Sequence, residues 1–191
     1  MSDKDLAFLK SLEDQIWFTR KARIRTSERL LSNKFHSNLI LVWYSFFSFS
    51  LSIYLIKEPK LFGDNADVIM TILTGAVFTL SLFVPQLNLT TRYEDIKKNY
   101  ILMQGLLFKL KFCKTESQLE KINNRYLRLL HAVENHTNLD LLYFLNYESG
   151  SNCTMKISVK DWILLQCYIV IRITLITLIY SAPIVFLVCY L

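Results

Sequence analysis

The first residues of this chain that could do chemistry are basic, and they lie close together on one short segment. Between residues 20 and 34, six basic residues accompany a single acid, Glu28. Such a surface could hold an anionic ligand, a nucleotide or a nucleic acid. It could also set membrane topology and bind lipid headgroups, at about 1 kcal/mol per cation near an anionic leaflet. We favour the second interpretation and keep the first as the alternative. The basic residues in question are Arg20, Lys21, Arg23, Arg25 and Arg29.

The sequence carries no signature of an enzyme or of a metal site. It contains no dinucleotide-binding fingerprint, no phosphate-binding loop, no H-E-x-x-H and no Cys/His quartet, and its four glycines are isolated. His131 and His136 flank Glu134, but a spacing of five places them on different faces of a helix, which is poor metal geometry. We therefore expect no catalytic residue, no metal and no cofactor.

Small and hydroxyl residues recur at helical spacing in three uncharged segments. Spacings of three, four and seven place each set on one face of its helix. Such faces could line a wet pore built from several copies, or they could let helices pack closely without water. We favour close packing and keep the pore as the alternative. The three sets are Ser45, Ser48 and Ser52; Thr71, Gly75 and Thr79; and Thr174, Thr177 and Ser181.

Arg172 is the one charge beside the last apolar run. An arginine inside a membrane suggests a gate or an anion path, because it costs roughly 2.5–3.5 kcal/mol at the centre of a span. If the span begins at Ile173, however, Arg172 lies at the inner headgroup level, behind an interfacial approach that contains Trp162. We favour this membrane-boundary position. Pro183 should kink the span and free a carbonyl near Ile179.

Three uncharged runs must position these residues, and each is long enough to cross a bilayer. They cover Ser37–Ile56, Val68–Thr91 and Ile173–Leu191, and a hydrocarbon core needs roughly 20 helical residues. A composition of 52% hydrophobic and 14% aromatic residues suits lipid-soluble helices. We predict an all-α membrane protein with a transmembrane helical hairpin and a third, C-terminal transmembrane helix.

The distribution of cations predicts the orientation. Lys and Arg number eight in Met1–His36, two in the Lys57–Asp67 loop and eleven in Arg92–Lys160. Cytoplasmic segments carry the excess of cations, so we place the first and third segments in the cytoplasm and the C-terminus outside. The chain is expected to be a multi-pass protein of the plasma membrane.

The cytoplasmic parts are predicted to be helical. An N-terminal amphipathic helix contains Leu9, Leu12 and Ile16, and FCKTES supplies a break and a Thr/Ser cap between two further helices. The expected parts are 1–36, a basic amphipathic helix; 37–91, the transmembrane hairpin; 92–160, a coiled-coil-like helical hairpin; and 161–191, the approach and third span. The apolar repeats of the cytoplasmic hairpin are Tyr93, Ile96, Tyr100, Met103, Leu107 and Leu110, then Leu119, Ile122, Tyr126, Leu129 and Val133.

Two polar segments resemble a known family. IWFTRKARIRTSERLL (Ile16–Leu31) and VENHTNLDLLYF (Val133–Phe144) resemble the SLATT proteins, the bacterial SMODS- and SLOG-associating membrane effectors, and look most like their fifth subfamily. The second segment contains E-N-H-x-x-x-D, at Glu134, Asn135, His136 and Asp140. The family's name implies two spans, so the third apolar run is a departure or an extension.

Membership would imply an anti-phage effector of the bacterial inner membrane, encoded beside a nucleotide-signal synthase, a nucleotide sensor or a reverse transcriptase. Such an effector permeabilises the membrane and halts the infected cell, as in abortive infection. Together with the residues, this implies a pore-forming homo-oligomer whose cytoplasmic helices receive a signal, which could be a nucleotide or a nucleic acid. The alternative is a non-conducting anchor or regulatory subunit that recruits a cytoplasmic enzyme.

Overall fold

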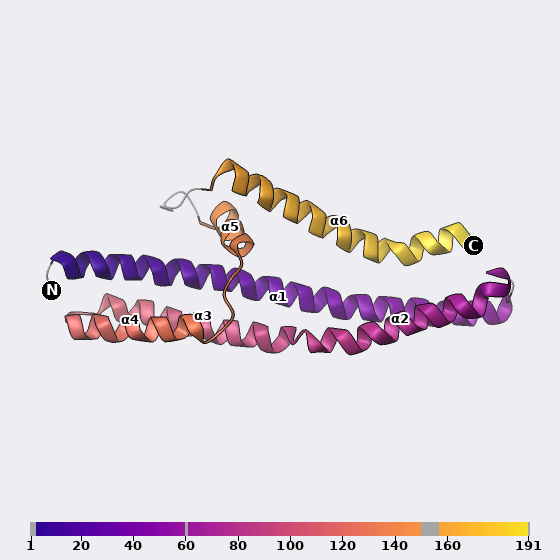
Figure 1. Cartoon of the computed structure of the whole chain (residues 1–191), viewed down its shortest axis with the longest axis horizontal. Coiled ribbons are helices and arrows are strands. Elements are labelled where there is room, and N and C mark those ends of the chain that lie inside the picture. Colours follow the sequence, from indigo (N-terminus) through magenta and orange to yellow (C-terminus); the bar gives the residue numbers. More distant parts are fainter. Residues whose placement is uncertain (1–2, 60, 150–156, 191) are drawn as a thin grey trace. The chain divides into compact units, whose positions relative to one another are not determined.

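The computed structural model of the chain describes residues 3–59, 61–149 and 157–190, and these residues are all-α (Figure 1). No Gly or Pro lies within the first helix, which lets it run for 55 residues until Pro59 follows its end. The elements in chain order are α1 (Asp3–Lys57), the short 3-10 helix η1 (Gly63–Asn65), α2 (Ala66–Gln86), α3 (Leu89–Lys111), α4 (Glu116–His131), α5 (Asn138–Tyr147) and α6 (Val159–Tyr190).

The chain divides into two compact units, and two of the helices contribute to both. The first, here called the charged unit, contains α1 up to Leu31, α3 to α5 and α6 up to Leu165. The second, called the apolar unit, contains α1 from Ser32, η1, α2 and α6 from Gln166. The predicted boundary at residue 36 falls inside α1, which continues through it without a break.

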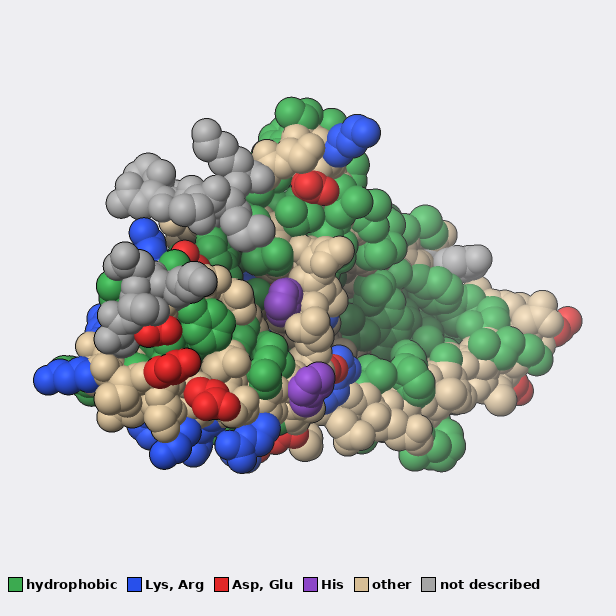
Figure 2. Space-filling model, turned by 60° about the vertical axis from the view of Figure 1, so that its left-hand side comes forward, with side chains coloured by type: hydrophobic (Ala, Val, Ile, Leu, Met, Phe, Trp, Pro, Cys, Tyr) green, Lys and Arg blue, Asp and Glu red, His purple; other side chains and the backbone are tan. Residues whose placement is uncertain are grey.

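Three helices are long and apolar enough to cross a membrane, judged by length and composition. They lie within Asp5–Lys57, Gly63–Lys111 and Val159–Cys189, and only 17%, 0% and 6% of their most apolar windows are buried. Figure 2 shows charged side chains gathered on one part of the molecule and a broad surface of hydrophobic side chains with few charges elsewhere. Lipid or other chains must therefore cover most of the apolar surface.

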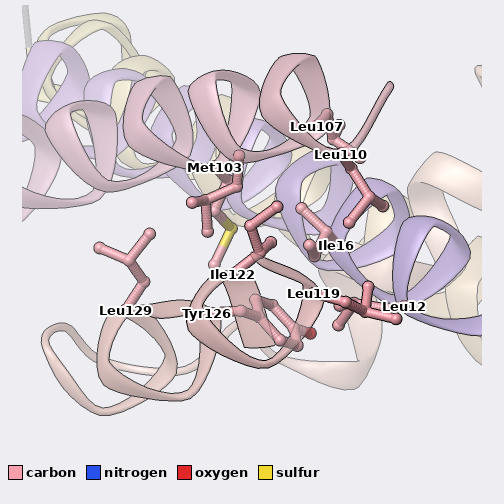
Figure 3. Close-up of a cluster of buried hydrophobic side chains, with 10 residues drawn as sticks. Leu12, Ile16, Met103, Leu107, Leu110, Leu119, Ile122, Tyr126 and Leu129 are labelled. Atoms are coloured by element: carbon pink, nitrogen blue, oxygen red, sulfur yellow. The ribbon is translucent and has the colours of Figure 1, made fainter. Parts of the chain in front are cut away.

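The core of the charged unit lies among α1, α3 and α4 (Figure 3). Helix α1 contributes Leu12 and Ile16, which cover the seam between α3 and α4. The predicted repeat of α4 is buried at all four of its positions from Leu119 to Leu129. In α3, Asn99 rather than the predicted Tyr100 is buried. The buried cluster is completed by Met103, Leu106, Leu107, Leu110, Ile122 and Tyr126.

Helices α3 and α4 form the predicted antiparallel hairpin. At the turn, the Thr115 side chain accepts a hydrogen bond from the Gln118 amide and caps α4, as FCKTES suggested. At the other end, the Asn99 side-chain amide donates to the carbonyl of Leu129 at 2.9 Å. The middle of α3 therefore lies beside the end of α4.

The second apolar run is interrupted where the sequence predicted continuity. The uncharged run over Val68–Thr91 was expected to form one span, but α2 ends at Gln86 and α3 begins at Leu89. Asn88 adopts φ +49°, a left-handed conformation that asparagine tolerates better than most residues. Pro85 precedes this break and contributes no backbone donor.

Inside the apolar unit, aromatic side chains of α1 compensate for the proline in α6. Pro183 has no N–H to donate to Ile179, and the Tyr44 hydroxyl donates to that carbonyl instead, at 2.9 Å. The Trp43 indole donates to the neighbouring carbonyl of Tyr180 at 3.2 Å. The freed carbonyl expected near Ile179 is thus the acceptor of an interhelical hydrogen bond.

Candidate functional site

Buried polar residues of α1 form the centre of the candidate site in the charged unit. Along α1, the apolar core positions Leu12 and Ile16 give way to Arg23, Thr26 and Ser27, which are exposed by at most 4%. Helical spacing keeps these residues on the face that lies toward the rest of the unit. The core of the unit is therefore polar along the segment of α1 that contains Arg23, Thr26 and Ser27.

Arg23 is fully buried and binds the end of α4. Its guanidinium donates to the Leu129 carbonyl at 2.9 Å, to the Leu130 carbonyl at 3.1 Å and to the Asn99 side-chain oxygen. Cations are favourable beside the last carbonyls of a helix. Burial lowers the pKa of Arg23, against a smaller opposing effect of Tyr126. Arg23 therefore holds α1 against α3 and the end of α4 inside the charged unit.

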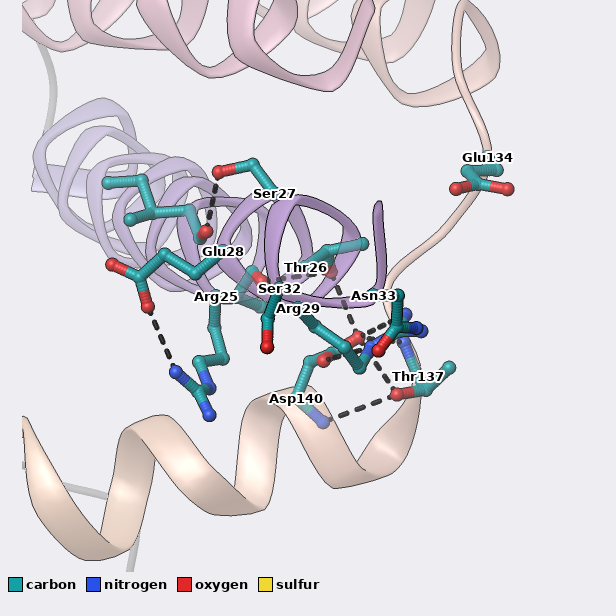
Figure 4. A network of polar contacts seen from close by, with 12 residues as sticks. Arg25, Thr26, Ser27, Glu28, Arg29, Ser32, Asn33, Glu134, Thr137 and Asp140 are labelled. Carbon is teal, nitrogen blue, oxygen red and sulfur yellow. Dashed lines mark hydrogen bonds and ion pairs between the residues drawn. The ribbon is translucent and has the colours of Figure 1, made fainter. Parts of the chain in front are cut away.

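Asp140 lies at the centre of a second set of contacts (Figure 4). It is 2% exposed, and Arg29 donates to its two oxygens at 2.8 and 3.0 Å. Thr26 donates a further hydrogen bond at 3.0 Å. Burial alone would raise the pKa of Asp140, but the hydrogen bonds from Arg29 and Thr137 outweigh it and hold the pKa below its ordinary value.

The same carboxylate caps α5. Thr137 is the N-cap residue, and its hydroxyl accepts a hydrogen bond from the Asp140 amide while Asp140 accepts from the Thr137 amide at 3.1 Å. This reciprocal arrangement is a capping box. Asp140 thus both starts α5 and attaches it to α1, and we call Thr26, Arg29, Thr137 and Asp140 the Asp140 network.

The other residues of the E-N-H-x-x-x-D segment have separate contacts. Glu134 pairs with Arg92 at 2.7 Å, in a partly exposed ion pair. The Asn135 side chain accepts from the amide of His136 at 3.0 Å. In the described part of the chain, the buried Nδ1 of His136 has no hydrogen-bond partner. Burial, and then the charge of Arg23, lowers the pKa of His136.

Other basic residues of the segment from residue 20 to residue 34 also make contacts within the charged unit. Arg25 pairs with Glu28 at 3.0 Å and lies 3.3 Å from the centre of the Tyr143 ring. Lys21 lies 5.9 Å from the rings of Trp17 and Phe144. Arg20 is half-buried, and its Nε has no partner among the residues described. The predicted binding of lipid headgroups or of an anionic ligand by these five residues stays a prediction.

The fold brings together the two polar segments singled out in the sequence, since Arg23 and Arg29 come from the first and Asp140 from the second. Sequence reasoning missed Asn99, Arg92 and Thr137. Thr137 was detectable as the start of a T-x-x-D capping box, and Asn99 as a polar residue within an apolar repeat. Nothing local marked Arg92, because its partner Glu134 is 42 residues away.

A family model matches residues 5–189, and its description is SMODS and SLOG-associating 2TM effector domain, family 5. This chain belongs to the SLATT family. As a SLATT effector domain it is associated with the conflict and defence systems that contain SMODS and SLOG domains, and members of the family are generally non-enzymatic membrane effectors. Neither a curated protein nor a solved structure matches it.

The family description specifies two transmembrane segments, whereas the described residues of this SLATT chain contain three helices of sufficient length and apolarity. The resemblance expected from the two polar segments is confirmed over nearly the whole chain. No group of three or more His, Cys, Asp or Glu that could hold a metal occurs in ranges 3–59, 61–149 and 157–190.

Most of the small and hydroxyl residues predicted as stripes are exposed in the apolar unit of this SLATT chain. Ser181 is half-buried, and Ser48 is buried at 6% exposure, with a hydroxyl that has no partner among the described residues. Thr71 and Thr79 donate to carbonyls of their own helix at 2.7 and 2.9 Å. Ser181 does the same toward Leu178 at 3.2 Å. The exposed members of the stripes are Ser45, Ser52, Thr71, Gly75, Thr79, Thr174 and Thr177.

Arg172 is held by neutral groups of α1. Its guanidinium donates to the Ser32 hydroxyl at 3.0 Å and to the Asn33 side-chain oxygen at 2.9 Å. Both acceptors precede the uncharged run that begins at Ser37. This polar level at the end of the apolar segments is compatible with the predicted membrane-boundary position.

Proposed function

We propose that this SLATT chain is a bacterial anti-phage effector of the abortive-infection type. Copies of the chain oligomerise in the inner membrane and permeabilise it when a cytoplasmic signal reaches the charged unit. The signal comes from a partner of the same defence operon, which is a nucleotide-signal synthase, a nucleotide sensor or a reverse transcriptase. The basic residues of α1 and the Asp140 network belong to the unit that receives it.

The proposed orientation follows from the cations. The N-terminus and the segment from Arg92 to Lys160 are cytoplasmic, and the C-terminus is outside. With this orientation the whole charged unit faces the cytoplasm. A signal made inside the cell can therefore reach it without crossing the membrane.

One observation carries the proposal: polar side chains are exposed on helices whose apolar windows are almost entirely uncovered. Ser45 and Thr177 are examples on α1 and α6. A polar group facing hydrocarbon is unfavourable, whereas a small polar group facing another helix or water is not. The stripes therefore favour contact between copies, and several copies are needed to enclose a path for ions.

Helix α1 supplies a physical route from signal to membrane, because it contributes Arg23 and Arg29 to the charged unit and Ser45 and Ser52 to the apolar unit. Opening is a shift between closed and open packings of the oligomer. A few kcal/mol of differential binding by the activator is enough to change which packing predominates.

The alternative function, a non-conducting anchor or regulatory subunit, has one observation in its favour. The hydroxyls of Thr71 and Thr79 are already satisfied by carbonyls of α2. They need no water, so their stripe can serve close helix packing alone.

The experiment that tests the proposal measures growth and membrane potential, with a voltage-sensitive dye, after this chain is induced in a bacterium with and without the adjacent genes of its operon. Prompt depolarisation with arrested growth is expected once the signal is present. A membrane that stays polarised in both cultures, although insertion of the chain is confirmed, contradicts permeabilisation and supports the anchor.

Two exposed stripe residues give matched variants. Ser45→Leu and Thr177→Leu should abolish depolarisation and preserve insertion, because they replace polar surface by apolar surface. Val42→Leu and Val185→Leu are the controls on the same helices, at positions that are already apolar and exposed. Ser48 is unsuitable because it is buried, so a leucine there would disturb packing.

A further inference from the structure

Helix α3, together with Phe112 directly after its end, has a second apolar face on the side away from the core. Ile101, Phe108 and Phe112 are exposed by 54%, 62% and 66%, although they belong to the packed charged unit. With Gly105 they follow a spacing of four, three and four residues, which is the spacing of one helix face. We call these four residues the outer stripe.

A groove lies at the end of the outer stripe, between α3 and α4. Its volume is about 420 Å³, and Phe108, Phe112 and Ile122 supply its apolar lining. The two phenylalanine rings are 5.2 Å apart, centre to centre. A concave site of this kind takes an apolar side chain from a partner.

Gly105 lies in the middle of the outer stripe and leaves room for another backbone. Apart from its chain neighbours and the adjoining backbone of α3, a Cβ at this position would meet no heavy atom within 4 Å. Small residues allow two helices to approach closely. A continuous stripe with a glycine at its centre and a groove at its end therefore fits a helix better than a flat lipid surface.

The charges around the groove indicate the chemistry of that helix. Lys109 and Lys121 line it, and none of the lining residues that the structure describes is a carboxylate. Nearby in the sequence, Lys111, Lys114, Glu116 and Glu120 are exposed, so cations outnumber acids four to two between residues 109 and 121. A second copy packed on the same face would bring these lysines against their equivalents. An acidic partner would instead be electrostatically complementary.

We propose that the outer stripe of α3 docks an amphipathic helix of a different protein, one that carries Asp or Glu beside its apolar face. The inference rests on the proposed function, because this docking is how the operon partner delivers its signal. The apolar residues anchor the helix, and Lys109 and Lys121 select for its acids.

The experiment places a benzophenone-bearing phenylalanine at position 108 of the full chain, expressed with its complete operon and irradiated in cells. The expected result is a crosslink to one operon protein, through a helix that mass spectrometry shows to be acidic and apolar. The same probe at Leu127, which is also exposed and apolar but lines no part of the groove, is the control and should give about tenfold less product.

Charge reversal tests the second half of the proposal. K109E with K121E should reduce the crosslink by about tenfold, whereas R125E with R128E changes the net charge equally on exposed sites outside the groove and should leave it. A crosslink to a second copy of this chain, to lipid, to a non-acidic segment, or no product above the Leu127 control would each overturn the proposal. An unchanged crosslink yield in the K109E with K121E variant would also overturn the proposal.

Membrane potential, recorded in the same cultures, separates this proposal from the proposed function. Depolarisation without a specific crosslink refutes the docking surface and leaves permeabilisation standing. A specific crosslink without depolarisation refutes permeabilisation and leaves the docking surface standing.

Discussion

In the charged unit, Asp140 accepts hydrogen bonds from three other side chains, two of which come from a helix more than 100 residues away. In the apolar unit, Thr71 and Thr79 donate only to carbonyls four residues back on their own helix. The first arrangement fixes helices against one another within a single chain. The second satisfies these hydroxyls within α2 alone and holds no other helix against it. Under the proposed function, lipid and neighbouring copies cover such faces.

Removal of the Asp140 carboxylate should have the largest effect on stability, and this effect should be confined to the charged unit. Asp140→Ala leaves Arg29 without its buried partner and removes the carboxylate half of the capping box of α5, so the charged unit should lose about 3–5 kcal/mol of stability. Hydrogen exchange of the full chain in lipid nanodiscs should show rapid exchange throughout α5. Unchanged protection of α5 would mean that aromatic contacts such as Trp17 with Phe144 hold this helix in place.

Acid should destabilise the charged unit, because burial lowers the pKa of its His136. His136 is protonated more readily in the unfolded chain, so its effect on stability is absent above about pH 6.5 and stability falls as the pH drops from there through the folded pKa. The loss is at most about 1.4 kcal/mol per pH unit. The contribution of Asp140 persists through this window, since its pKa is held below the ordinary value of 3.8.

The measurement compares hydrogen exchange of α4 and α5 at pH 7.5 and pH 5.5. His136→Gln should remove most of the difference, and His131→Gln, at an exposed site on α4, should not. If the change in hydrogen exchange between the two pH values were the same in both variants, a group other than His136 would cause the pH dependence.

A smaller effect is expected where the apolar unit has a contact between helices. Tyr44→Phe leaves the Ile179 carbonyl without its donor and should cost about 0.6 kcal/mol, rising to ~1.7 kcal/mol if no water replaces it. In a Pro183→Ala background, the restored backbone N–H should remove that cost. Resistance to unfolding in SDS, measured for the four chains of this cycle, tests the coupling, and equal costs in both backgrounds would disprove it.

The smallest effect is expected at the exposed ion pair of the charged unit. Glu134→Gln removes the partner of Arg92, but both side chains are more than a third exposed, so stability should change by about 0.2–1 kcal/mol. Hydrogen exchange at the end of α4 should be nearly unchanged. If the loss of stability were as large as that expected for Asp140→Ala, solvent exposure would not explain why Asp140 is expected to matter more than Glu134.

Local patterns made much of the fold predictable. The uncharged run that begins at Ser37 ends within a residue of the observed end of α1, and the α4 repeat and the Thr115 cap follow from spacing and from turn chemistry. The break at Asn88 was missed because asparagine permits a left-handed conformation without requiring it.

The candidate site was predictable only in part. The motif residues were recognised, but the burial of Arg23 was not, since a cation in a basic segment normally faces water. Its acceptors are carbonyls 106 and 107 residues along the chain, and a carbonyl has no sequence signature. Contacts of this range depend on the packing of α1 against α4.

The separation of 111 residues between Arg29 and Asp140 also sets an order of events during synthesis. At ~5–20 residues per second, about 6 to 22 s pass between translation of the arginine and of its carboxylate. A ribosome that stops between residues 58 and 137 leaves α1 complete and α5 absent. Only chains translated beyond residue 140 can close the Asp140 network, so arrested translation yields a product that lacks this network of the unit that we propose receives the signal.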